Sequence, residues 1–217
     1  METAQALRTP RAAAIAGILF SVLLITSQVL VWISLPTTLE APAIDVIRES
    51  RKVSLAFNLV PFAGIAFLWF IAVVRNRLGA REDRFFATVF LGSGLLYVAM
   101  IFTSAALAGG VIRVLSKTPE ILVQTGAYDL VRAEIYQAMN VYGIKMAGVF
   151  MFSTSTILLR TGIVPRWIPV LGYAFGAILL LSIGIIVWIP LLFPVWVFVV
   201  SAAILIENPS NVPGASP

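Results

Sequence analysis

The sequence contains no cysteine and no histidine among its 217 residues. Without cysteine there is no disulfide, no thiolate metal site and no cysteine nucleophile. Without histidine there is no imidazole ligand for haem or zinc, no Ser-His-Asp triad and no histidine proton shuttle. Because most membrane redox proteins and intramembrane hydrolases depend on one of these groups, we expect a protein that is not an enzyme and that holds no cofactor and no metal ion.

Charged residues are also scarce, at 12% of the chain, whereas 60% of the residues are hydrophobic. The hydrophobic residues gather in six runs, which are 12–35, 53–74, 85–108, 138–159, 167–187 and 190–206. A helix needs about 20 apolar residues to cross the hydrocarbon core of a bilayer, and the first five runs reach that length. Since backbone polar groups must be paired inside lipid, such runs form helices. The sequence therefore predicts an all-α fold, a polytopic transmembrane helix bundle with six spans.

The spans and their connections use almost the whole chain, so we expect no separate soluble domain. We predict a single transmembrane helical domain over 1–206 and a disordered polar tail, rich in proline and serine, over 207–217. Residues 167–206 form nearly continuous apolar sequence, which we interpret as two crossings with a turn near Pro190 and Pro194. Because the last run is short, a re-entrant hairpin is the alternative for this segment.

Residue patterns beyond the third run and in the connection that follows it predict additional helical structure. The third run is expected to continue as a helix past Gly109 towards Leu115. In the long connection 116–137, Thr118-Pro119-Glu120 is typical of a helix start. Asp129 marks a second start, which can lead straight into the fourth run.

The net charge of +5 comes from basic residues scattered over several loops. With no Lys/Arg run and no stripe of interleaved aromatic residues, we expect no binding of nucleic acid. Connections on the side of the N-terminus hold more Lys and Arg than those on the other side, which places both termini in the cytoplasm. The 12 arginines against 3 lysines, with abundant alanine, are typical of a GC-rich bacterial genome. We therefore predict a multi-pass protein of the bacterial cytoplasmic (inner) membrane, with the lipid bilayer as its surroundings.

Lys145 is the only charged residue set well inside an apolar run. Gln28 and Asn58 lie at a comparable depth in the first and second runs, and Tyr142 shares a helix face with Lys145. These four residues predict an intramembrane polar pocket for a ligand, which the positive lysine would bias towards an anionic or carbonyl-bearing molecule. The alternative is structural. Lys145 would extend to the lipid headgroups and the other polar residues would form hydrogen bonds between helices.

Small residues at a spacing of four recur in the spans. Gly172 and Gly176 form a GxxxG motif in the fifth run, and Gly143 and Ala147 form a similar pair in the fourth. Such spacing permits two helix backbones to approach closely. It predicts either packing within the chain or a homo-oligomer through Gly172 and Gly176, and it does not separate the two.

Three segments of the chain carry a resemblance to known proteins. They are RAAAIAGILF at 11–20, the block from Phe67 to Met100, and RTG with PRW between 160 and 167. The chain resembles an uncharacterised family of bacterial, actinobacterial-type, six-helix integral membrane proteins classed under a domain of unknown function. The resemblance implies a six-helix inner-membrane protein, and it implies neither an activity nor site residues.

These observations predict an integral membrane protein that binds or translocates a small or lipophilic molecule through the polar pocket. No carboxylate lies at the depth of Lys145 inside another span. The lysine therefore has no acidic residue to pair with, and proton-coupled transport usually depends on such a pair. The alternative is a non-catalytic assembly or scaffold subunit of a membrane complex, packed on a partner through the glycine faces.

Overall fold

The computed structural model describes residues 8–35, 43–78, 84–182, 186 and 188–206, and the secondary structure of these residues is helical. Three long helices are α2 (Arg8–Ser34), α4 (Ser50–Leu78) and α5 (Arg84–Leu115). A fourth runs without interruption over Ala127–Thr161. It consists of α7 (Ala127–Tyr136), the π-helix η2 (Gln137–Gly143) and α8 (Ile144–Thr161).

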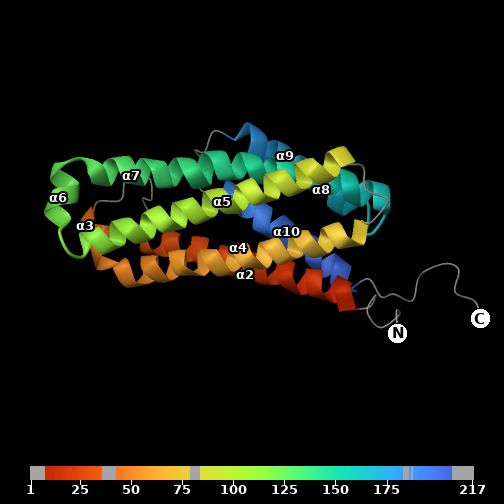
Figure 1. Ribbon diagram of the computed structural model, residues 1–217, viewed down its shortest axis with the longest axis horizontal. Coiled ribbons are helices and arrows are strands. Elements are labelled where there is room, and N and C mark those ends of the chain that lie inside the picture. Colours follow the sequence, from red (N-terminus) through yellow and green to blue (C-terminus); the bar gives the residue numbers. More distant parts are fainter. Residues whose placement is uncertain (1–7, 36–42, 79–83, 183–185, 187, 207–217) are drawn as a thin grey trace, which may run out of the picture.

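The four long helices lie side by side along the length of the molecule (Figure 1). At one end, here called the distal end, lie the short helices α3 (Ala43–Arg48) and α6 (Pro119–Gln124). At the other, here called the terminal end, α2 begins and α10 (Leu192–Ile206) ends. Helix α4 therefore begins near the distal end and ends near the terminal end, as the alternation of spans predicts.

The last two helices are much shorter than the four long ones. Helices α9 (Trp167–Leu181) and α10 have 15 residues each, so each is about 22 Å long. A 3₁₀ turn, η3 (Ile189–Leu191), precedes α10. The pair forms a hairpin that enters from the terminal end and stops part of the way along the long helices (Figure 1).

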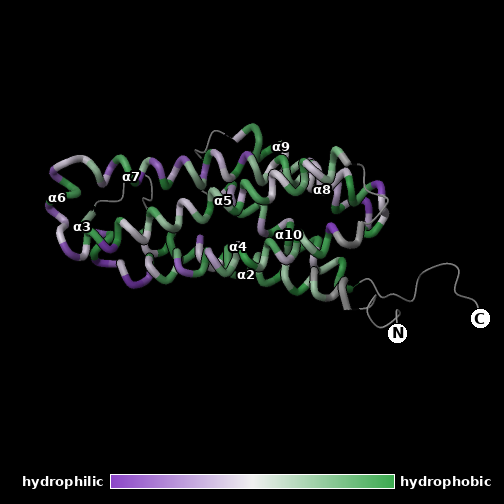
Figure 2. Tube along the Cα trace, in the orientation of Figure 1, coloured by the Kyte–Doolittle hydropathy of each residue, from purple (hydrophilic) through white to green (hydrophobic). Residues whose placement is uncertain are grey.

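Five helices are long and apolar enough to cross a membrane, and α9 is a shorter apolar helix. Hydrophobic residues cover most of the bundle, and hydrophilic residues gather near its two ends (Figure 2). The predicted all-α bundle is confirmed, and these helices fit a multi-pass membrane protein. The count of six spans stays a prediction, because α9 ends at Leu181 instead of reaching 187. The predicted tail, 207–217, lies outside the described residues.

The helix signals in the connections are confirmed. Helix α5 continues past Gly109 and ends at Leu115. Helix α6 begins at Pro119, directly after Thr118. The fourth long helix begins at Ala127 and leads through Asp129 into the fourth apolar run.

The terminal half of the bundle is closed on all sides and filled. Helix α10 packs on α2, α9 packs on α8, and α5 packs on both α4 and α8. An aromatic cluster joins these helices, formed by Phe20, Phe67, Tyr97, Phe150 and Phe193. All five side chains are buried, and the rings of Phe67 and Phe193 lie 5.5 Å apart near its middle. No channel can pass this cluster unless the rings move apart.

A second, smaller hydrophobic cluster closes the distal end. Its buried members are Leu35, Val46, Val53, Leu115 and Tyr128, which come from the ends of the long helices and from α3. The interior therefore contains two hydrophobic clusters at different levels along the bundle.

A hydrogen bond from Ser27 joins α2 to α4 near the distal end. Its hydroxyl donates to the backbone carbonyl of Ala56 at 2.7 Å, and the serine is buried. We expect Ser27→Ala to lower the free energy of unfolding by about 0.6 kcal/mol, the usual size of such a bond between membrane helices. Unfolding of both proteins in mixed micelles measures this. Thr103→Val is the control, because Thr103 is exposed and bonds only to Ala99 of its own helix. A larger loss in the control would contradict this account.

Candidate ligand-binding cavity

A cavity of about 150 Å³ lies between the two hydrophobic clusters, in the distal half of the bundle. Ile101 and Pro190 line its inner side, and Leu35, Val46 and Tyr128 line its distal side. Its other walls come from α2, α4, α5, α7 and η2. These wall residues are Ser27, Gln28, Val31, Trp32, Val53, Phe57, Val60, Ser104, Ala108, Val111, Ile112, Arg132, Ile135, Tyr136, Met139 and Asn140.

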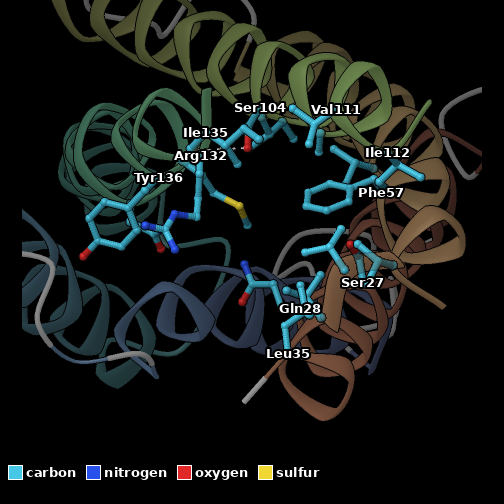
Figure 3. A pocket seen from close by; sticks show the side chains of 18 of the residues that line it. Ser27, Gln28, Leu35, Phe57, Ser104, Val111, Ile112, Arg132, Ile135 and Tyr136 are labelled. Atoms are coloured by element: carbon cyan, nitrogen blue, oxygen red, sulfur yellow. Dashed lines mark hydrogen bonds between the residues drawn. The ribbon is translucent and has the colours of Figure 1, made fainter. Parts of the chain in front are cut away.

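The cavity exists because the α9–α10 hairpin stops short. In the terminal half, α9 and α10 fill the space between α2 and α8. In the distal half, α2, α4, α5 and α7 form an open arc, since α2 packs on α4 and α7 packs on α5. Figure 3 shows the cavity between these helices.

Arg132 is the only charged residue among those that line the cavity in the described part of the chain. It lies on α7, and its guanidinium carbon is 5.6 Å from the centre of the Tyr128 ring. Its Nη2 atom lies 3.3 Å from Oδ1 of Asp129. The Arg132 side chain is 29% exposed and that of Asp129 is 71% exposed, so the cation is at the cavity and the carboxylate is in solvent.

Gln28 lies in the cavity wall formed by α2 (Figure 3). The glutamine is 5% exposed, and its Oε1 accepts no hydrogen bond from any described residue. Gln28 also lines a small second cavity of about 10 Å³, together with Tyr97 and Leu179. A space of this size is about what one water molecule needs.

Of the four residues expected to form one pocket, only Gln28 lines the cavity. Asn58 is exposed on α4, where its Nδ2 donates to the hydroxyl of Ser54 at 3.3 Å. Tyr142 lies on η2 and is 61% exposed. Neither Asn58 nor Tyr142 is among the residues that line the cavity, and the same is true of Lys145.

Lys145 caps the end of another helix. Its ammonium donates hydrogen bonds to the backbone carbonyls of Leu179 at 3.2 Å and Leu180 at 2.6 Å, and also to that of Ser182. Helix α9 ends at Leu181 because Ser182 is extended, with φ −60° and ψ 134°. The last carbonyls of a helix have no partner within it, and a cation there is favourable. Lys145 thus supports the end of α9, and it does not line the cavity.

Sequence reasoning missed Arg132, the cation that does line the cavity. The residue lies in the connection 116–137, outside the apolar runs where intramembrane charge was sought. The helix start at Asp129 was the available signal, because it places Arg132 in a turn near the beginning of the fourth long helix. What could not be foreseen is that the partner hairpin ends early and leaves this turn beside a cavity.

Gly172 and Gly176 are buried within the chain. A Cβ atom on Gly172 would lie 2.8 Å from Cε2 of Trp196 on α10. A Cβ on Gly176 would lie 2.8 Å from Cδ2 of Phe152 and 3.2 Å from the carbonyl of Gly148, both on α8. The GxxxG motif therefore serves the close packing of α9 on α8 and α10, and its glycines are not presented on an outer face.

The described residues contain no group of three acidic side chains that could hold a metal ion. Comparison of the chain with protein-family models, curated proteins and solved structures finds no match. The resemblance to a bacterial six-helix family therefore stays a prediction, and the cavity itself is the basis for a functional proposal.

Proposed function

We propose that this chain is a non-enzymatic, multi-pass protein of the bacterial cytoplasmic membrane that binds a small lipophilic molecule in the distal cavity. The observation that supports this most is the cavity beyond the tip of the α9–α10 hairpin, with the buried amide of Gln28 in its wall. Ligand sites are typically apolar cavities with a few polar groups that fix orientation. The walls described here have that composition.

The size of the cavity limits the ligand. An apolar cavity of about 150 Å³ in a well-studied soluble protein takes up a benzene-sized molecule. The present cavity has about that volume and is partly open. It suits a ligand with one compact apolar group, whose remaining atoms extend out of the cavity.

Binding is favoured over translocation. The aromatic cluster around Phe67 and Phe193 fills the terminal half, where a path through the bundle would have to run. If the termini are cytoplasmic, as the distribution of Lys and Arg favours, the cavity lies in the outer half of the protein. A ligand would then reach it from the outer leaflet or the outer solution.

The scaffold hypothesis depended on glycine faces as contacts for a partner. Two of these glycines, Gly172 and Gly176, are buried against α8 and α10, and we propose no scaffold function here.

A cavity-filling variant tests the proposed function. Ala108 is 4% exposed and lines the cavity, so we expect Ala108→Phe to fill part of the space. The probe is 4-phenylbutanol, a neutral molecule with one benzene-sized group, added to protein in nanodiscs. A ligand at a hundred times its Kd stabilises by about 2.7 kcal/mol, which raises the thermal midpoint by several degrees. We expect this rise in the wild type and its loss in Ala108→Phe.

Ala106→Phe is the matched control, because Ala106 is exposed on the same helix, two residues away. It should respond to 4-phenylbutanol like the wild type. An equal rise in all three proteins would mean that the alcohol acts through the bilayer, and it would contradict binding in the cavity.

A further inference from the structure

We infer that the ligand of the distal cavity is an uncharged amphiphile whose hydroxyl group is bound by the side-chain amide of Gln28. Its apolar part would lie against the hydrophobic walls of the cavity. This inference rests on the proposed function and adds the chemical class of the ligand.

Gln28 carries a buried polar group that the chain leaves unpaired. The glutamine is 5% exposed, and its Oε1 accepts no hydrogen bond from any described residue. Most buried polar groups in proteins are paired, and an unpaired one lowers stability. Since Gln28 lines the cavity (Figure 3), a bound molecule can supply the partner that the chain does not.

A hydroxyl group can pair with either end of this amide. The amide has an acceptor oxygen at one end and two N–H donors at the other. Rotation about the last side-chain torsion of a glutamine exchanges the two ends, and this torsion is broad and roughly two-fold. A hydroxyl both donates and accepts, so it is complementary to the amide in both orientations.

The other uncharged polar groups of the cavity have less need of a ligand. The hydroxyl of Ser27 donates to the carbonyl of Ala56, and that of Ser104 donates to the carbonyl of Ile135 at 3.3 Å. Asn140 on η2 also lines the cavity, but it is half-buried and so less shielded from water than Gln28. Gln28 is therefore the group on which we base recognition.

The charge of Arg132 is already engaged by other side chains of this protein. Its Nη2 atom lies 3.3 Å from Oδ1 of Asp129, and its guanidinium carbon lies 5.6 Å from the centre of the Tyr128 ring. An anionic ligand would have to compete with these contacts. A cationic ligand would have no counter-ion, because no acidic residue is among the described residues that line the cavity.

The burial of Gln28 also favours an uncharged partner. A group that pairs with a buried amide leaves bulk water when it binds. A carboxylate or an ammonium loses far more hydration free energy in such a place than a hydroxyl does, unless an opposite charge compensates it. The hydroxyl is therefore the polar group that the site can bind at the lowest cost.

Three molecules with the same phenyl group test this selectivity: 4-phenylbutanol, butylbenzene and 4-phenylbutyrate. They are titrated at neutral pH against protein in nanodiscs of uncharged lipid, and each affinity is referred to the measured concentration of the molecule in the bilayer. One net hydrogen bond between uncharged groups corresponds to about a three- to tenfold change in affinity. We expect the wild type to bind the alcohol more tightly than butylbenzene by this factor, and to bind the acid worst.

Gln28→Met removes the amide and keeps a side chain of similar length. It should abolish the advantage of the alcohol and leave the affinity for butylbenzene unchanged. Because the variant loses an unpaired polar group, its thermal midpoint without ligand should be no lower than that of the wild type. A lower midpoint would mean that Gln28 supports the fold through a partner of its own, and it would contradict the inference.

Asn58→Leu is the matched control, since it also removes an amide, but Asn58 is exposed on α4 and does not line the cavity. It should change none of the three affinities. If the wild type binds butylbenzene or the acid as tightly as the alcohol, or if Gln28→Met keeps the advantage of the alcohol, the inference is wrong and the proposed function stands. If none of the three molecules binds, both fail.

Discussion

Replacing Lys145 with methionine is expected to lower the free energy of unfolding by about 3 kcal/mol. The change would leave the carbonyls of Leu179, Leu180 and Ser182 without their cationic donor. A buried polar group without a partner costs about 1–3 kcal/mol, and more where the lost partner was charged. For a chain of this length the loss corresponds to a fall in thermal midpoint of about 6–12 °C. Thermal unfolding in nanodiscs, followed by circular dichroism, measures it.

Lys52→Met provides the comparison. Lys52 is 57% exposed and pairs at 2.8 Å with Glu49, three residues earlier. Exposed pairs of this kind contribute at most about 1 kcal/mol, so the midpoint should fall by only a few degrees. If Lys145→Met unfolds at the same temperature as the wild type, the lysine does not support α9. The alternative, in which its side chain extends to the headgroups, would then be preferred.

Gly172→Ile is expected to destabilise the chain by at least about 3 kcal/mol, at the upper end of what overpacking costs. The first added carbon would lie 2.2 Å from the hydroxyl oxygen of Ser155 and 2.8 Å from the ring of Trp196. The serine can turn away, but Trp196 is fully buried and has nowhere to move. The same unfolding measurement applies, and the yield of folded protein in detergent gives a second reading.

Gly92→Ile is the control for this substitution. Gly92 lies inside α5, and a Cβ there would meet nothing within 4 Å. Both variants replace a helical glycine by the same residue, so helix propensity changes equally and only the packing differs. If Gly172→Ile keeps wild-type stability and instead splits an oligomer into monomers, the glycine acts between chains, and the internal packing described above is incorrect.

The long helices could be predicted from the sequence because their apolar runs exceed the thickness of a membrane. The helix starts at Pro119 and near Asp129 were also visible, since they depend on local chemistry. The early end of α9 was not visible. Residues 167–206 are almost uniformly apolar, and the feature that accompanies the end of the helix, the ammonium of Lys145, comes from α8, more than thirty residues away.

The candidate site could be predicted only in part, for the same physical reason. Gln28 was found because a polar residue inside an apolar run is rare. Lys145 is also a polar residue inside an apolar run. The sequence cannot distinguish a lysine that binds backbone carbonyls from one that binds a ligand. Arg132 has no signature at all, since an arginine in a connection is ordinary until the neighbouring helices show that it borders a cavity.

The most direct test of the account is the accessibility of a single cysteine in the cavity, which the cysteine-free chain permits. Ala108→Cys would be treated with methyl methanethiosulfonate in nanodiscs, with and without 4-phenylbutanol, and Ala106→Cys would be treated in parallel. The account predicts that the thiol at 108 reacts, and that the alcohol slows its modification in proportion to the fraction of protein occupied. The thiol at 106 should show no such protection. A thiol at 108 that reacts only after the protein is unfolded, or that is never protected, would contradict a ligand-accessible cavity beyond the α9–α10 hairpin.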